Sequence, residues 1–201
     1  MSFDRSANLI EEDGELYYLP AFIDAEAAAN LFRDLRKELD WQEETITIAG
    51  RQVRVPRLVC WYGDEHARYR YSGVMHDPKP WTESLLRIKA RIEAFCRLPF
   101  NSVLGNLYRD GRDSMGWHAD KEKALGRNPV IASLSLGATR LFRLRQPASG
   151  KSMELDLQDG SLLIMGGTLQ HHWRHSLPKS QAALDARINL TFRRIMSEDK
   201  A

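Results

Sequence analysis

Two segments of the chain repeat apolar residues at the three- and four-residue spacing of an amphipathic helix. The first runs from an N-cap at Asp24 to about Leu39. Its apolar stripe consists of Leu31, Phe32, Leu35 and Leu39. The second segment opens at Pro80-Trp81-Thr82, and its stripe consists of Leu85, Ile88, Ile92 and Phe95. We expect both helices to pack on a core and to carry no site of their own.

The remaining pattern alternates with the two-residue period of β-strands. Residues 45–48 and 52–55 alternate around Ala49-Gly50-Arg51, which predicts a β-hairpin with an exposed basic tip. From Val103 onward strands follow one another quickly, separated by glycine-rich turns. The clearest of them are residues 131–136, 140–144, 153–157, 161–165 and 187–195. Many short strands at this spacing favour a double-sheet sandwich or jelly roll with the helices packed outside.

Size and charge narrow the class of protein only slightly. A chain of 201 residues can bury a sizeable core in one domain, and 29 basic residues nearly balance 27 acidic ones. Cys60 and Cys96 lie far apart, and the chain start shows no basic-then-apolar signal region. No apolar run approaches the length of a membrane span. We therefore expect a single cytoplasmic domain that has no membrane partner.

The candidate chemistry starts with two residues on one strand face. His118 and Asp120 are two positions apart, so an extended backbone sends both side chains to the same side. A further histidine would complete the two-histidine, one-carboxylate set that binds Fe(II) in non-haem oxygenases and leaves positions open for substrates. His171, His172 and His175 all lie downstream. The alternation of side chains along a strand (its parity) cannot by itself show which of them is the ligand.

A second polar set is predicted by the strand from residue 187 to residue 193. Ile188, Leu190 and Phe192 share one face. Arg187, Asn189, Thr191 and Arg193 share the other. The two arginines then point either into one pocket or toward solvent. Asn106 and Tyr108 also share a face and would add an amide and a phenol to such a pocket.

In their order, these motifs resemble the AlkB family of Fe(II)- and 2-oxoglutarate-dependent dioxygenases, the human homologues two and three among them. The resemblance covers about residues 45–195 and rests on several short segments in sequence order. They are residues 55–57 (Val-Pro-Arg), 62–64 (Tyr-Gly-Asp), 71–73 (Tyr-Ser-Gly), 78–81 (Pro-Lys-Pro-Trp), 106–111 (Asn-Leu-Tyr-Arg-Asp-Gly), 118–120 (His-Ala-Asp), 160–163 (Gly-Ser-Leu-Leu), 175–178 (His-Ser-Leu-Pro) and 187–193 (Arg-Ile-Asn-Leu-Thr-Phe-Arg).

The resemblance implies a ligand set and a cosubstrate site. His118, Asp120 and His175 match the iron ligands of the family, whereas His171 and His172 match none. Arg187 matches the arginine that pairs with the distal carboxylate of 2-oxoglutarate, a role suited to a guanidinium fork. The other positions that match cosubstrate contacts are Asn106, Tyr108, Asn189 and Arg193.

It also implies residues that contact a substrate base. Tyr71 matches an aromatic that stacks on the base, and His118 would cover the opposite face of the base. Glu122 matches an acidic group near the nitrogen atoms of the base. Tyr69 and Arg57 complete the expected substrate-contacting set, and Ala49 stands where relatives acting on duplexes carry a bulky wedge.

The activity implied is oxidative demethylation of N-alkylated bases in DNA, with RNA also open. Fe(II), 2-oxoglutarate and O2 would convert an N-methyl group to formaldehyde and leave succinate and a repaired base. The implied fold is a double-stranded β-helix (jelly roll) of α+β class, mainly β, in one domain over residues 1–201. About residues 15–80 would supply the N-terminal helix and a β-hairpin substrate lid, and about residues 100–196 the catalytic core. We expect the protein to be a monomer. We also expect it to prefer single-stranded DNA, because Ala49 is too small to act as a wedge in a duplex.

The local clusters of basic residues do not decide whether the partner is a nucleic acid. Arg51, Arg54 and Arg57 follow the hairpin tip, and basic residues also stand at 140, 143 and 145. These groups could contact phosphates, and solvated strand faces explain them about as well. Two other classes also remain. One is an oxygenase of the same chemistry acting on a protein or small molecule, and the other is a non-catalytic nucleic-acid-binding module whose histidines hold structural zinc or no metal.

Overall fold

The computed structural model describes residues 7–48, 50–71, 74–182 and 184–196, with the backbone alone at 48, 69–71 and 74–76. The two long helices are α1 (Ala25–Glu38) and α2 (Glu83–Cys96). A four-residue helix, α3 (Leu169–His172), and a 3-10 turn, η2 (Lys123–Leu125), follow later. The strands are β1 (Glu15–Leu19), β2 (Gln42–Ile48), β3 (Arg51–Gly63), β4 (Tyr69–Tyr71), β5 (Val74–His76), β6 (Ser102–Tyr108), β7 (Met115–His118), β8 (Ile131–Gly137), β9 (Arg140–Arg145), β10 (Ser152–Leu157), β11 (Leu162–Gly166), β12 (Arg174–Leu177) and β13 (Arg187–Arg193).

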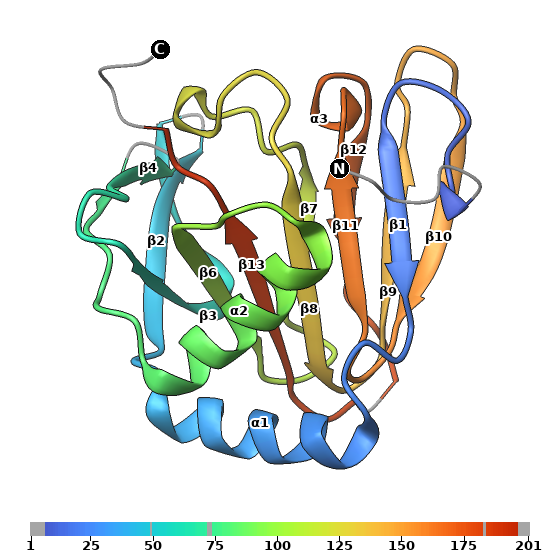
Figure 1. Cartoon of the computed structure of the whole chain (residues 1–201). Helices are drawn as coiled ribbons and strands as arrows, with labels where there is room; N and C mark the ends of the chain where they lie inside the picture. The colour runs from blue at the N-terminus through green and yellow to red at the C-terminus, as the bar shows by residue number, and fades with distance from the viewer. Residues whose placement is uncertain (1–6, 49, 72–73, 183, 197–201) are drawn as a thin grey trace.

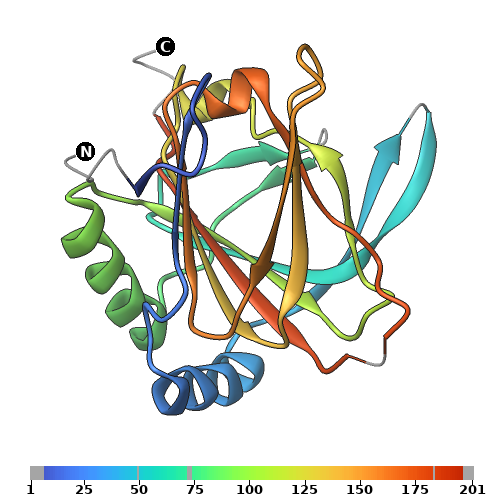
Figure 2. The same cartoon turned by 90° about the vertical axis from the view of Figure 1, so that its right-hand side faces the viewer.

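The strands of the described residues form two facing antiparallel sheets, which is the predicted jelly-roll architecture (Figure 1). The larger sheet has the order β1-β11-β8-β13-β6-β3-β2, and the smaller has the order β10-β9-β12-β7. A separate pair, β4 and β5, lies beside them. Figure 2 shows the long helices on the outside of the larger sheet. The space between the two sheets is therefore left to the residues that point inward.

Both long helices begin where the sequence predicts. The Asp24 side chain accepts the Ala27 N–H, and the Thr82 hydroxyl accepts the Leu85 N–H, so each first turn is capped. Leu35, Leu85 and their stripe neighbours pack on the larger sheet. Phe95 is a correction to the predicted stripe. It remains 40% exposed and meets Phe22 edge to face instead of entering the core.

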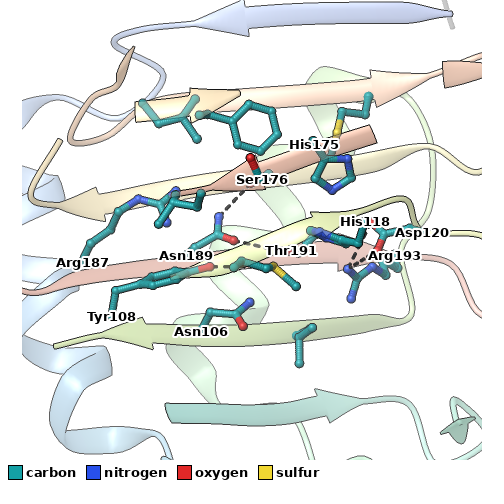
Figure 3. A pocket seen from close by; sticks show the side chains of 17 residues that line it. Asn106, Tyr108, His118, Asp120, His175, Ser176, Arg187, Asn189, Thr191 and Arg193 are labelled. Atoms are coloured by element: carbon teal, nitrogen blue, oxygen red, sulfur yellow. Dashed lines mark hydrogen bonds and ion pairs between the residues drawn. The ribbon is translucent and has the colours of Figure 1, made fainter. Parts of the chain in front are cut away.

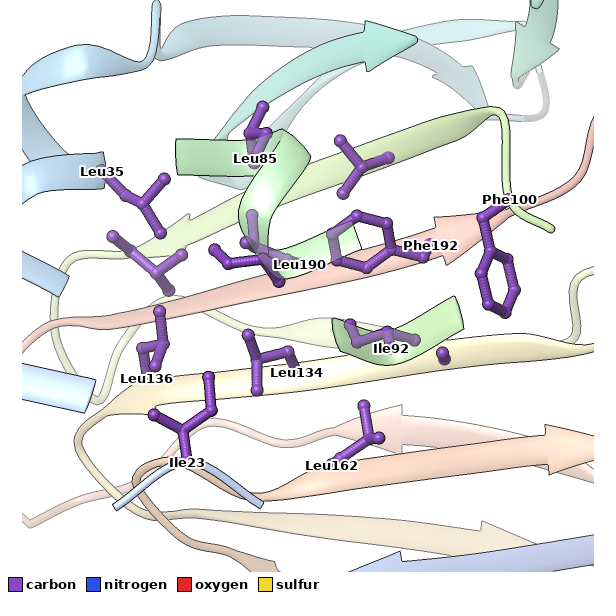
Figure 4. Packing of buried hydrophobic residues seen from close by; sticks show 14 of the residues in the cluster. Ile23, Leu35, Leu85, Ile92, Phe100, Leu134, Leu136, Leu162, Leu190 and Phe192 are labelled. Carbon is purple, nitrogen blue, oxygen red and sulfur yellow. The ribbon is translucent and has the colours of Figure 1, made fainter. Parts of the chain in front are cut away.

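The main core lies between the helices and the outer face of the larger sheet (Figure 4). Ile188, Leu190 and Phe192 of β13 point into this core, as their alternation predicts. Both neighbours of β13, the strands β6 and β8, contribute to the same core. The opposite face of β13 therefore points into the space between the two sheets.

The predicted hairpin is present as β2 and β3, whose closing residue pair is Ile48 with Arg51. Gly50 has a φ of +77°, a conformation that suits glycine in so short a turn. Strand β3 runs beyond the predicted end at Val55 to Gly63, and its second half pairs with β6. The hairpin therefore projects from the edge of the larger sheet, as Figure 2 shows on the right.

The basic residues on the strands are not all exposed. Arg143 and Arg145 of β9 face solvent, but Arg140 is only 2% exposed, because the two-residue period places positions 140, 142 and 144 inward. Arg57 is also buried. The expectation that Arg57 and Arg140 belong to exposed basic clusters is therefore wrong. Arg54 is exposed, but it pairs with Glu43.

Two features bear on the cellular setting. Cys60 and Cys96 are free and buried, and burial raises the pKa of each thiol to about 12. Both thiols therefore stay protonated and unreactive at neutral pH. Within the described ranges, no helix combines the length and apolar character needed to cross a membrane.

Leu190→Ala should lower the free energy of unfolding by about 2–5 kcal/mol, because it opens a cavity where β13 meets the helices. Denaturant unfolding of the purified protein measures the change. Val53→Ala is the control, because Val53 is 42% exposed on the hairpin and should change stability by less than about 1 kcal/mol. A small loss for Leu190→Ala would contradict the assignment of this face to the core.

Candidate active site

The interior face of β13 carries a row of buried polar residues. Arg187, Asn189, Thr191 and Arg193 all line one pocket between the two sheets (Figure 3). In the register, Arg187 lies opposite Tyr108 and Asn189 lies opposite Asn106, so two neighbouring strands present their polar side chains together. The alternative in which the two arginines face solvent is wrong for this strand, since each is at most 3% exposed.

One end of this pocket holds a compact group of metal-binding side chains. Among the described residues, His118, Asp120 and His175 place one potential ligand atom each within 4.8 Å of the others. His118 and His175 are paired directly across β7 and β12, and their ring centroids are 4.1 Å apart. Asp120 follows the end of β7. The strand pairing therefore selects His175 from the three downstream histidines, which parity could not do.

The other two histidines lie elsewhere. His171 and His172 stand on α3 with partly exposed side chains. The His171 Nε2 lies 2.5 Å from the Arg127 carbonyl oxygen, and His172 is 3.8 Å from Asp13. Neither ring enters the His118, Asp120 and His175 group. Helix α3 nevertheless supports that group, because the Gln170 side-chain carbonyl accepts the Asp120 N–H at 2.9 Å.

Local contacts leave the triad ready to receive a cation. The His118 Nδ1 lies 2.9 Å from the Gly116 carbonyl. A carbonyl can only accept, so we assign the proton to Nδ1, which leaves the Nε2 lone pair available. Arg193 lies 3.3 Å from both oxygen atoms of Asp120 and holds the carboxylate in place. The Nδ1 of His175 is buried and has no hydrogen-bond partner in the described ranges, as expected of a site completed by a ligand.

The protonation states also suit metal binding. Burial alone would raise the pKa of Asp120, but the charges of Arg193 and the two histidines lower it to about 2. Burial and the nearby His118 lower the pKa of His175 to about 3, although Asp120 acts in the opposite direction. At neutral pH the group therefore offers an ionised carboxylate and a neutral His175 ring. These are the forms that coordinate a metal ion.

The other end of the pocket is built around Arg187. Its Nη2 donates to the Ser135 hydroxyl at 2.9 Å, whereas its Nε and Nη1 are buried and have no hydrogen-bond partner among the described residues. Burial and the positive charge of Arg140 lower the pKa of Arg187 to about 10, so the guanidinium stays charged at neutral pH. A buried charge with two unused donors calls for an anionic partner. The pocket lining gives two arginines against one carboxylate, Asp120.

Two serines of β8 support this pocket and were not identified from the sequence. Ser135 holds Arg187, and Ser133 accepts from the Asn189 amide at 2.7 Å. The signal was present, because Ser133 and Ser135 alternate with Leu134 and Leu136. That alternation places hydroxyls on the interior face and leucines in the helix-covered core.

The residues expected to contact a base fall into four groups. Glu122 is partly buried just beyond Asp120, and its Oε2 has no hydrogen-bond partner within the described part of the chain. Arg57 lies behind the pocket and donates to the Asn106 Oδ1 at 2.7 Å. Tyr69 and Tyr71 belong to β4, where the backbone alone is described. Ala49 lies outside the described residues.

Comparisons with known proteins agree with this arrangement. Residues 15–193 match the 2OG-Fe(II) oxygenase superfamily. The chain is 38% identical over 191 residues to the alpha-ketoglutarate-dependent dioxygenase alkB homolog 3 of Bos taurus, an alignment covering 90% of this chain and 66% of the relative. It is 39% identical over 184 residues to the DNA oxidative demethylase ALKBH2 of Homo sapiens, covering 86% of this chain and 70% of the relative.

A solved structure has the same fold. The structure of OsALKBH1 superposes with a TM-score of 0.64 and covers 92% of this chain and 99% of that chain. Sequence identity to OsALKBH1 is 20%, so this likeness speaks for the fold alone. The chain spans 66% of the length of the Bos taurus alkB homolog 3.

Proposed function

Because this chain belongs to the 2OG-Fe(II) oxygenase superfamily, and within it to the AlkB family, we propose that it oxidatively demethylates N-alkylated bases in DNA. The observation that carries the proposal is one pocket with a metal-binding triad at one end and a buried, charged Arg187 at the other. This pocket can receive a metal ion and a dicarboxylate side by side. The similarity to proteins named DNA oxidative demethylases supports nucleic acid as the substrate.

The donor set fits Fe(II). Two imidazoles and one carboxylate occupy three positions and leave the others free, as non-haem iron oxygenases require. When bound, iron with 2-oxoglutarate and O2 supplies oxidation of an N-methyl group, ending in the free base, formaldehyde, succinate and carbon dioxide. His118, Asp120 and His175 would hold the ion. Arg193 and Gln170 would keep Asp120 in place.

The chain's own polar residues would orient the cosubstrate. Arg187 would take the distal carboxylate with the two donors that lack partners. Asn106, Tyr108 and Asn189 line the same pocket and would contribute further polar contacts. Arg57 would fix the rotamer of Asn106, since it donates to the amide oxygen.

The base would enter next to the metal group. A base inside a duplex cannot reach a pocket between two sheets, so it must be flipped out or lie in a single strand. Glu122 would then accept an N–H from the base, because its buried Oε2 has no hydrogen-bond partner among the residues that the structure describes. Tyr71 would stack on the base, with Tyr69 beside it. The β2–β3 hairpin would act as part of a lid.

A panel of oligonucleotides tests the substrate class. The protein is incubated with Fe(II) and 2-oxoglutarate on single-stranded DNA, duplex DNA and RNA carrying 1-methyladenine or 3-methylcytosine, and base masses are followed. We expect loss of one methyl mass, fastest on single-stranded DNA. If no methylated base is altered while 2-oxoglutarate is still consumed, a protein or a small molecule is the substrate.

We further propose that the protein acts as a cytoplasmic monomer with a preference for single strands. The two free, buried thiols suit a reducing compartment. The preference follows from Ala49, which stands in the sequence between the two strands of the hairpin, because an alanine offers little surface to fill the gap left by a flipped base. Analytical ultracentrifugation of the purified protein tests whether it sediments with the mass of one chain.

Ala49→Phe should raise the rate of repair on duplex DNA about tenfold and leave the single-strand rate nearly unchanged. A phenylalanine would offset part of the unstacking cost, which is a few kcal/mol per step. Single-turnover repair of matched strands measures both rates, with Ala49→Ser as a small polar control. Equal rates on the two substrates for the unmodified protein would show that another loop supplies the wedge.

A further inference from the structure

Arg140 is a buried arginine whose side chain donates to backbone carbonyls. It is 2% exposed, although it stands at the start of β9. Its Nη1 donates to the Asp110 carbonyl at 3.1 Å, and its Nη2 donates to the carbonyls of Asp113 and Pro178 at 2.8 Å and 2.7 Å. Within the described residues, no carboxylate forms an ion pair with it. Burying such a charge is costly, and the nearby charges of Asp113 and Asp110 offset only part of that cost, because the pKa of Arg140 is still lowered.

The three carbonyls belong to the chain segments that flank the metal-binding strands. Asp110 and Asp113 lie in the turn between β6 and β7, and β7 ends at His118. Pro178 follows β12, which carries His175. One guanidinium therefore joins the entry of one ligand-bearing strand to the exit of the other. The turn itself is stiff, because the Arg109 guanidinium binds both oxygens of Asp113 at 2.8 and 2.9 Å.

Arg140 also contacts Tyr108, a residue that lines the pocket beside Arg187. Its Cζ lies 5.7 Å from the centroid of the Tyr108 ring, and the Cζ of Arg187 lies 5.3 Å from the same centroid. Both distances are within the range of cation–π contacts. Tyr108 is thus held by two guanidiniums, of which Arg187 lines the pocket and Arg140 does not.

The positive charge of Arg140 also acts on Arg187, which lines the pocket. Its proximity is one cause, after burial, of the lowered pKa of Arg187. Two cations close together in a buried region repel each other, and a dianion bound between the sheets would relieve that repulsion. The positive potential at this end therefore favours a ligand with a second carboxylate.

We propose that Arg140 is a positioning residue of the cosubstrate site. It holds Tyr108 and the ends of β7 and β12 in the geometry that receives the distal carboxylate of 2-oxoglutarate. The inference rests on the proposed placement of that carboxylate at Arg187. It assigns a role in cosubstrate selection to a residue outside the pocket.

The test compares two 2-oxo acids of equal length. Calorimetry on Mn(II)-loaded protein measures the binding of 2-oxoglutarate and of 2-oxopentanoate, which lacks the distal carboxylate. Arg140→Met should weaken 2-oxoglutarate binding roughly tenfold, the scale of losing a group that orients a ligand-binding side chain, and should change 2-oxopentanoate binding much less. The 2-oxoglutarate affinity of Arg140→Lys should lie between those of the unmodified protein and Arg140→Met, because lysine keeps the positive charge but not the forked guanidinium.

Two further readouts separate positioning from general loosening. In the metal-free protein, Arg140→Met should speed amide hydrogen exchange at residues 110–115 and leave the helices α1 and α2 protected. In turnover assays, the KM for 2-oxoglutarate should rise more than kcat falls. Arg143→Met is the matched control, because Arg143 is exposed on the same strand and pairs only with Glu154 among the described residues.

Three results would overturn the proposal. The first is unchanged 2-oxoglutarate binding in Arg140→Met, and the second is equal weakening of both 2-oxo acids. If Arg140→Met fails to fold, Arg140→Lys is tested in its place. The deciding quantity is again the ratio of the affinities for 2-oxoglutarate and 2-oxopentanoate. The third is an unmodified protein that binds both 2-oxo acids equally, which would remove the carboxylate site at Arg187 and the role of Arg140 with it.

Discussion

Replacing His175 with alanine should reduce turnover to the background of metal-free protein. His175 supplies one of only three protein ligands, and its partner across the strand pair, His118, cannot hold the ion with Asp120 alone. His118→Ala and Asp120→Ala should have the same effect. Calorimetric titration with Mn(II) and assays of 2-oxoglutarate consumption measure the losses of binding and of activity.

The controls for this prediction lie four and three residues before His175. His171→Ala and His172→Ala remove imidazoles from α3, outside the triad, and should retain turnover and metal binding. Thermal unfolding should be followed for each variant, so that loss of fold is not mistaken for loss of metal. A collapse of metal binding in either control would show that the ligand set is wrongly assigned.

Arg187→Lys should raise the KM for 2-oxoglutarate about 10- to 100-fold while metal binding is largely kept. The substitution keeps a positive charge but loses the fork that binds a carboxylate through two hydrogen bonds, and one such charged bond contributes about 1.5–3 kcal/mol. The loss is expected to fall on the proposed cosubstrate site, because Nε and Nη1 of Arg187 have no hydrogen-bond partner among the described side chains. Initial rates at varied 2-oxoglutarate measure it.

Arg194→Lys is the matched control for that substitution. Arg194 follows β13 directly and is exposed, so the same chemical change there should leave KM unaltered. If Arg187→Lys behaves like Arg194→Lys, the distal carboxylate does not bind at Arg187, and the pocket must hold a different anion.

Alternation along strands made much of the site predictable. In β13, a run of seven residues divides cleanly into an apolar set facing the helices and a polar set facing the interior. The same rule brought Asn106 and Tyr108 to one face of β6. Such predictions succeed because a strand buried on both sides offers each residue only two directions, and the chemistry of the residue indicates which.

Contacts between distant segments could not be predicted in this way. The choice of His175 depends on the pairing of β12 with β7, which no local pattern encodes. The clustering of basic residues along the sequence places Arg140 and Arg57 among groups that contact phosphates or face solvent, although alternation with Phe142 and Leu144 puts position 140 on the inward face. The structure buries both, and each is accommodated by acceptors from other strands and loops. Such acceptors become visible only when the chain is folded.

The most direct test of the account is a count of products on one defined substrate. The protein, with Fe(II), 2-oxoglutarate and O2, is given single-stranded DNA containing 1-methyladenine, and adenine, formaldehyde and succinate are measured together. We expect one formaldehyde for each adenine formed, at least as much succinate, and none of the three products with Asp120→Ala. Adenine formed without 2-oxoglutarate, or succinate formed without any adenine, would contradict the assignment of this pocket as a demethylase site.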